Sequence, residues 1–89
     1  MVNKNIIKIR KKLDILDNSF ISLIKKRTEL VKKVLKLKKN KNQIIDRNRI
    51  KIILNSIRKK SIKNKIDPKI TNRIWKNMIW SYIDFEKRN

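Results

Sequence analysis

The chain has 89 residues, and its 27 lysines and arginines against 7 acidic residues give a formal net charge of +20 at pH 7. It contains no cysteine, histidine or glycine. Disulfides, thiol chemistry, the usual zinc ligands and glycine-rich phosphate loops are therefore excluded, and we expect no metal or cofactor. The charge would attract polyanions or small multiply charged acids, although a proteome rich in lysine, asparagine and isoleucine would produce the same excess.

One stretch, from Ile6 to Lys38, has apolar residues alternating at steps of three and four, which is typical of one face of a long helix. These residues are Ile6, Ile9, Leu13, Leu16, Phe20, Leu23, Leu30, Val34 and Leu37. Arg27 falls in the same series, between Leu23 and Leu30. A cation on a buried face needs a partner, because desolvating it alone is costly.

A helix from Ile6 to about Lys39 would be on the order of 50 Å long. A compact chain of this size has a radius of gyration near ~12 Å, so such a helix would extend beyond its own domain. The sequence therefore predicts an all-α fold with one long and two shorter helices, in an intertwined homodimer. We expect one domain, residues 1–89, in the cytoplasm, because no apolar stretch has the length of a signal-peptide core or a membrane span.

The remainder of the chain predicts two shorter helices. Asn40 to Gln43 is expected to be a loop, and Asp46 an N-cap for a helix that ends near Lys60. Ile50, Ile53, Leu54 and Ile57 give that helix its apolar face. Ser61 to Ile66 is expected to be a second loop, and Asp67-Pro68 then starts the last helix.

The last helix is expected to bury five side chains, namely Ile74, Trp75, Met78, Ile79 and Tyr82. Four residues after Tyr82, the same face carries Glu86. Two interpretations remain open: Glu86 is a buried functional carboxylate, or it lies in water on a frayed last turn.

The order of these features resembles the all-helical AroQ class of chorismate mutases over nearly the whole chain. The resemblance rests on Arg10, Arg27 and Lys38 in the first helix, on the segment Asp46-Arg47-Asn48-Arg49, and on the final IWKNMIWSYIDFE. It implies a homodimeric enzyme that rearranges the dianion chorismate to prephenate in phenylalanine and tyrosine biosynthesis. This pericyclic reaction requires no nucleophile, metal or acid–base cycle.

By resemblance, Arg27 and the partner's Arg10 would hold the substrate carboxylates, and Lys38 would contact a carboxylate and the ether oxygen. On an ideal helix Lys38 lies about 20° from Arg27, whereas Arg10 is more than about 20 Å away along the axis. The substrate-binding set would be completed by Asp46, Arg49 and Tyr82. Glu86 stands where many relatives have a glutamine that donates to the ether oxygen, so we expect it to act in its protonated form.

Two positions depart from the family pattern. Ile50 replaces a glutamate that contacts the substrate's ring hydroxyl, and Tyr82 replaces a small hydroxyl residue. Both changes resemble isochorismate–pyruvate lyase, which is the alternative function, although Ile50 also fits plain packing of the second helix. A basic module that binds nucleic acid is a further alternative, less favoured because Arg27 lies in the apolar series rather than on an exposed face.

Overall fold

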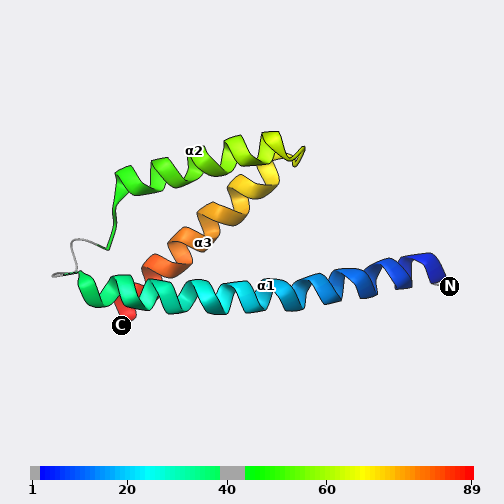
Figure 1. Cartoon of the computed structure of the whole chain (residues 1–89), viewed down its shortest axis with the longest axis horizontal. Helices are drawn as coiled ribbons and strands as arrows, with labels where there is room; N and C mark the ends of the chain where they lie inside the picture. Colours follow the sequence, from blue (N-terminus) through cyan, green and yellow to red (C-terminus); the bar gives the residue numbers. More distant parts are fainter. Residues whose placement is uncertain (1–2, 39–43) are drawn as a thin grey trace. The chain divides into compact units, whose positions relative to one another are not determined.

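The computed structural model describes residues 3–38 and 44–89, which form three α-helices and no strand (Figure 1). They are α1 (Lys4–Leu37), α2 (Arg47–Lys63) and α3 (Pro68–Arg88). The predicted all-α class, with one long and two shorter helices, is confirmed. α1 ends at Leu37, slightly before the predicted end, and the loop predicted for Asn40 to Gln43 lies outside the described residues.

The chain divides into two compact units, Met1–Lys33 and Val34–Asn89. The first unit consists of one helical segment, and no residue of α1 is buried. The predicted apolar series is exposed along its whole length, from 44% at Ile6 to 82% at Leu37. A single helix cannot cover its own apolar face, so this series remains in contact with water in the isolated chain.

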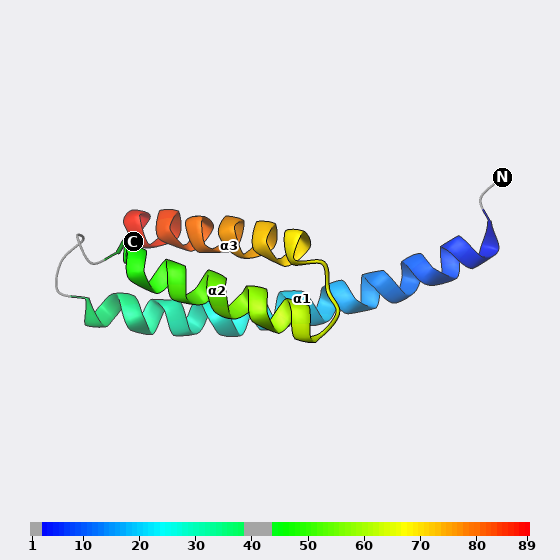
Figure 2. The ribbon, with the colours of Figure 1, turned by 90° about the horizontal axis from the view of Figure 1, so that it is seen from above.

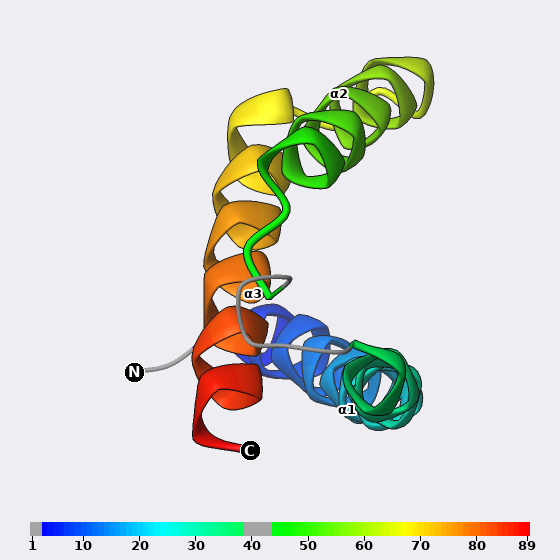
Figure 3. The same cartoon turned by 90° about the vertical axis from the view of Figure 1, so that its left-hand side faces the viewer.

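In the second unit, α2 and α3 run in roughly opposite directions (Figure 2), and they diverge from the turn that joins them (Figure 3). Ile79 and Ile83 of α3 form its buried core with Ile44, which precedes α2. Five half-buried side chains pack around them: Leu35, Ile45, Ile50, Ile53 and Leu54. The core therefore joins the end of α1 and both shorter helices.

The buried face of α3 differs in part from the prediction. Ile79 is buried, and Trp75, Met78 and Tyr82 are half-buried, as expected. Ile74 is 45% exposed in this chain, because at 100° per residue it lies about 140° around the helix from Ile79. The buried side chain that the prediction omitted is Ile83, one turn after Ile79.

Both predicted helix starts are confirmed. Asp46 caps α2 by accepting a hydrogen bond from the backbone N–H of Arg49 at 3.0 Å. Asp67 caps α3 by accepting from the backbone N–H of Lys69 at 2.9 Å, and Pro68 occupies the first turn. Each carboxylate satisfies an N–H group that has no partner within the helix.

The loop predicted for Ser61 to Ile66 is wrong in its first half, because α2 continues to Lys63. Ser61 is only 3% exposed, and its hydroxyl lies 2.6 Å from the hydroxyl of Thr71 on α3. It also donates to the backbone carbonyl of Ile57 at 2.6 Å. The serine and lysines of this segment suggest a loop when the sequence is considered alone. In the structure, the buried contact between the Ser61 and Thr71 hydroxyls stabilises the last turn of α2.

Shortly after α2, one residue has a left-handed backbone conformation although it is not glycine. Lys65 has φ 58°, the backbone N–H of Lys65 donates to the Ile62 carbonyl at 3.1 Å, and that of Ile66 donates to the Ser61 carbonyl at 2.9 Å. This pair of hydrogen bonds is the Schellman pattern, whose left-handed position favours glycine. The chain has no glycine, so a lysine occupies the position and carries the steric cost.

We predict that Lys65→Gly stabilises the protein by roughly 0.5–1 kcal/mol, because relief of the left-handed strain exceeds the added chain entropy of glycine. Urea unfolding measures the change. The matched control is Lys63→Gly within α2, which should instead cost about 1 kcal/mol. Equal destabilisation by both substitutions would show that the turn is not strained.

Candidate active site

Glu86 is a buried carboxylate near the end of α3. The helix continues to Arg88, and Glu86 is 7% exposed, so the interpretation as a frayed last turn is wrong. It follows Ile79 by seven residues and Ile83 by three, which places it on the face that packs in the core. A carboxylate at such a position needs a charged or hydrogen-bonding partner.

Lys38 is that partner. Its Nζ lies 3.4 Å from Oε2 and 3.5 Å from Oε1 of Glu86, and the Lys38 side chain is 21% exposed. Lys38 directly follows α1, where its backbone N–H donates to the Leu35 carbonyl at 3.2 Å. Because Leu35 packs on the core, the end of α1 is held where the lysine ammonium reaches the carboxylate. The two charges stand 48 positions apart in the sequence.

Lys38 also lines an open depression of about 610 Å³ at the start of α2. The other residues around it are Ile45, Asp46, Arg47 and Asn48. The predicted site residues Lys38 and Asp46 are therefore brought together, and Glu86 joins them through its ion pair with Lys38. This depression is the candidate active site.

Arg49 and Tyr82 belong to the same unit of the chain. Arg49 is exposed in the first turn of α2, and its backbone N–H bonds the Asp46 cap. Tyr82 is half-buried on α3, one turn before Glu86 and on the same face. Arg10 and Arg27 belong to the unit Met1–Lys33, and their part in the site stays a prediction.

Besides the apolar Ile45, two residues of the depression were not among those predicted from the sequence, namely Arg47 and Asn48. Both stand between Asp46 and Arg49, in the segment that supports the family resemblance. Their position next to two expected site residues was a signal in the sequence. The helical spacing alone did not show which of the four side chains border the depression.

Ile50 is half-buried and packs against the core cluster of Ile44, Ile79 and Ile83. The interpretation of Ile50 as a packing residue is thus confirmed. An aliphatic side chain cannot bond a substrate hydroxyl, so the same residue also removes one polar contact from this part of α2.

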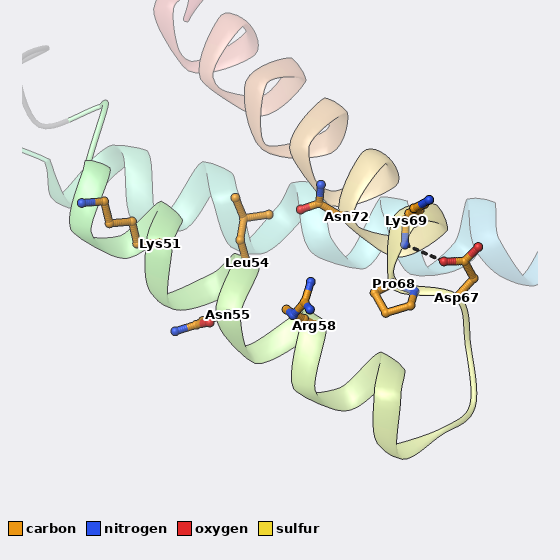
Figure 4. Close-up of a pocket in the computed structure, with 8 residues that line it drawn as sticks. All are labelled: Lys51, Leu54, Asn55, Arg58, Asp67, Pro68, Lys69 and Asn72. Carbon is orange, nitrogen blue, oxygen red and sulfur yellow. Dashed lines mark hydrogen bonds between the residues drawn. The ribbon is translucent and has the colours of Figure 1, made fainter.

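A second open depression, of about 680 Å³, lies where α2 and α3 converge (Figure 4). It is lined by Lys51, Leu54, Asn55, Arg58, Asp67, Pro68, Lys69 and Asn72. Its carboxylate, Asp67, already accepts the Lys69 backbone N–H that Figure 4 shows as a dashed line. None of the predicted site residues lines it, so it is not the candidate active site.

The candidate site offers fixed charges rather than a nucleophile. A lysine ammonium and a buried carboxyl group face each other, with arginine and asparagine side chains at the border of the depression. Groups of this kind bind an anion, orient it and stabilise charge that develops on an oxygen atom. They suit a rearrangement that needs positioning and electrostatic stabilisation alone.

Comparison with known proteins agrees with this chemistry. The family model for chorismate mutase type II matches residues 9–87, nearly the entire chain. Searches of curated proteins and of solved structures gave no significant match.

The chain therefore belongs to the all-helical chorismate mutase family. It is an isomerase that acts on chorismate and forms prephenate, on the route to phenylalanine and tyrosine. Within residues 3–38 and 44–89, no helix has the length and apolar character needed to cross a membrane.

Proposed function

We propose that the enzyme carries out this rearrangement in the depression beside Lys38, with Lys38 and Glu86 as its catalytic pair. The observation that carries the proposal is the ion pair itself, a carboxylate 7% exposed with a lysine ammonium 3.4 Å away. A buried pair of this kind is weak support for stability, since apolar side chains would pack there at lower desolvation cost. Its position at the candidate site favours a role in the reaction.

In the proposed mechanism, the ether oxygen of chorismate binds between Lys38 and Glu86. As the carbon–oxygen bond breaks and the carbon–carbon bond forms, negative charge grows on that oxygen, and two donors stabilise it. The Lys38 ammonium is one donor. In this proposal the ether oxygen replaces the Glu86 carboxylate as the partner of Lys38, and Glu86, having taken up a proton from water, is the other donor, because an ionised carboxylate can only accept hydrogen bonds.

The remaining predicted residues bind the substrate in this proposal. Arg27 holds one carboxylate, and Arg10 of the second protomer holds the other, since a guanidinium fork bonds a carboxylate at two points. Asp46, Arg49 and Tyr82 complete the wall of the site. Together these groups fix chorismate in the compact conformation from which the new bond can form.

We further propose that two copies of the chain form an intertwined homodimer, with residues 1–89 of each as one functional domain. The support is the apolar series of α1, at least 44% exposed in the single chain over more than 30 residues. Exposed apolar surface of this extent marks an interface. A cytoplasmic location stays a prediction of the sequence, and cell fractionation tests it.

Isochorismate–pyruvate lyase activity is the second candidate function. The observation that favours it is that Ile50 stands where many chorismate mutases have a glutamate, so no carboxylate is present at that position to bond the ring hydroxyl of chorismate. Discrimination between isomers that differ in the place of a hydroxyl depends on such a bond.

The dimeric site can be tested by mixing two inactive variants, Arg10→Ala and Lys38→Ala. A mixed dimer has one site with both substitutions and one site with neither, because Arg10 comes from the other protomer. Joint unfolding and refolding of equal amounts should restore about a quarter of wild-type activity, since about half of the dimers are mixed and each has one intact site.

The controls are each variant refolded alone, which should remain inactive. If the joint mixture also stays inactive while size measurements show dimers, Arg10 does not serve the partner's site. A monomeric active enzyme would contradict the dimer itself.

Glu86→Gln should retain at least roughly half of the wild-type kcat, because an amide donates the same hydrogen bond to the ether oxygen. In the control Glu86→Leu the side chain has a similar volume but no hydrogen-bond donor, so kcat should fall about 100-fold. An inactive but folded Glu86→Gln enzyme would contradict the proposed donor.

Both candidate functions can be compared directly by giving the purified enzyme chorismate and, separately, isochorismate. We expect prephenate from chorismate, without pyruvate. Turnover of isochorismate to pyruvate and salicylate at a higher kcat/KM would favour the lyase. Salt-sensitive binding to nucleic acid without turnover of either substrate would instead favour the basic binding module.

A further inference from the structure

The exposed faces of α2 and α3 carry cations that the proposed reaction does not use. The depression of about 680 Å³ where the two helices converge adjoins another open depression, of about 980 Å³, along α3, because Lys69 and Asn72 line both. We name the two together the α2–α3 basic surface. Its cations are Lys51, Arg58, Lys69, Arg73 and Lys76.

These five side chains are exposed, and their charge is not compensated by the protein. In the described part of the chain, residues 3–38 and 44–89, none of them forms an ion pair with a carboxylate. α2 has no acidic residue along its length. The carboxylate of the surface, that of Asp67, accepts the backbone N–H of Lys69 at 2.9 Å. The surface therefore has a positive potential that attracts anions.

The cations are spread along the two helices rather than gathered at one point. Lys51 and Arg58 are about 10 Å apart along the axis of α2, and Lys69 and Lys76 are about 10 Å apart along that of α3. Figure 4 shows Lys51 and Lys69 at opposite ends of the first depression. A small anion contacts only part of such a set, whereas a chain of phosphate groups can contact all of it.

An exposed aromatic side chain lies on the same face of α3. Lys69, Arg73 and Lys76 fall within about 60° around the helix, and Trp80 follows Lys76 by one turn inside that sector. Trp80 is 42% exposed, so a flat group can stack on its indole ring. Asparagine side chains add neutral hydrogen-bonding groups to the surface, namely Asn55, Asn72 and Asn77.

We propose that the α2–α3 basic surface binds single-stranded nucleic acid, as a second function separate from the rearrangement of chorismate. Cations that contact phosphates, together with an aromatic ring that stacks on a base, are typical of binding to single strands without sequence preference. Arg27 lies in an apolar series and does not support this function, but the five cations of this surface lie on exposed faces.

Two other occupants fit the surface less well. A second copy of the chain would place like charges against each other, and the apolar series of α1 is the proposed dimer interface. A membrane surface binds helices that insert an apolar face, whereas the members of this α3 sector other than Trp80 are cationic.

α1 offers a matched control for the effect of net charge. Lys25, Lys32 and Lys36 are exposed within about 40° of one another, on the side of the helix opposite Arg27, and Glu29 lies among them. Replacing these three lysines by glutamine removes as much positive charge as replacing Lys69, Arg73 and Lys76.

The experiment measures binding of the full chain to a fluorescently labelled single-stranded oligouridylate by anisotropy, between about 50 and 200 mM salt. The triple variant Lys69→Gln, Arg73→Gln, Lys76→Gln should bind at least roughly tenfold more weakly. Its slope of log Kd against log salt should fall by about 2, because each phosphate contact on a single strand contributes about 0.7. The α1 triple variant should keep the wild-type slope.

Trp80→Leu tests the stacking contact. The substitution should weaken binding about tenfold and leave the salt slope unchanged, because stacking releases no counterions. An unchanged affinity would show that Trp80 does not contact a base and would overturn the proposed mode of binding.

Equal loss of affinity in the two triple variants would overturn the proposal, because it would indicate attraction by net charge. Absence of binding by the wild type, or tighter binding to phosphatidylglycerol vesicles than to the oligouridylate, would overturn it too. If the α3 variant fails to fold, Lys51→Gln with Arg58→Gln decides, since the salt slope should fall by about 1.4.

Chorismate turnover, measured on the same samples, separates this inference from the proposed function. The α3 triple variant should keep wild-type kcat, which also shows that it is folded. If the wild type binds the oligouridylate but turns over no chorismate, the proposed function is wrong and the role of this surface stands. If it turns over chorismate but binds no oligouridylate, only this inference is wrong.

Discussion

The candidate site depends on one constraint, the placement of a carboxyl group on the buried face of α3. Glu86 is 7% exposed, and an isolated charge at that level of burial would be strongly unfavourable. Lys38, directly after α1, supplies the opposite charge that stabilises this carboxylate, and Leu35 packs the end of α1 on the core. The ion pair thus links two elements distant in sequence and brings the lysine beside the start of α2.

The helix ends show how a chain without glycine still defines sharp boundaries. Two aspartates cap α2 and α3, and a lysine accepts the left-handed conformation that ends α2. The buried hydroxyl pair of Ser61 and Thr71 then joins α2 to α3 close to their connection. The start of α2 is held near the end of α1 by the core instead, where Leu35 and Ile45 pack around Ile44.

The charge of the chain has two separate consequences. Most of its 27 lysines and arginines lie on exposed surface, where they raise the local concentration of an anionic substrate without selecting it. Selectivity needs cations in fixed positions, and those depend on burial, pairing or a helix end. Lys38 is such a cation, because its ammonium is paired with Glu86. Its fixed position distinguishes it from the exposed basic residues of the chain.

The sequence by itself determined the three helices, both aspartate caps, the apolar series of α1 and the family. Each of these features follows from the local spacing of residue types along the chain, because that spacing decides where helices form and begin. Only the tertiary structure decided that Glu86 is buried against Lys38, that Ser61 belongs to a helix, and that Arg47 borders the site. Periodicity indicates which residues share a face, but packing between distant segments decides what covers that face and which side chains meet there.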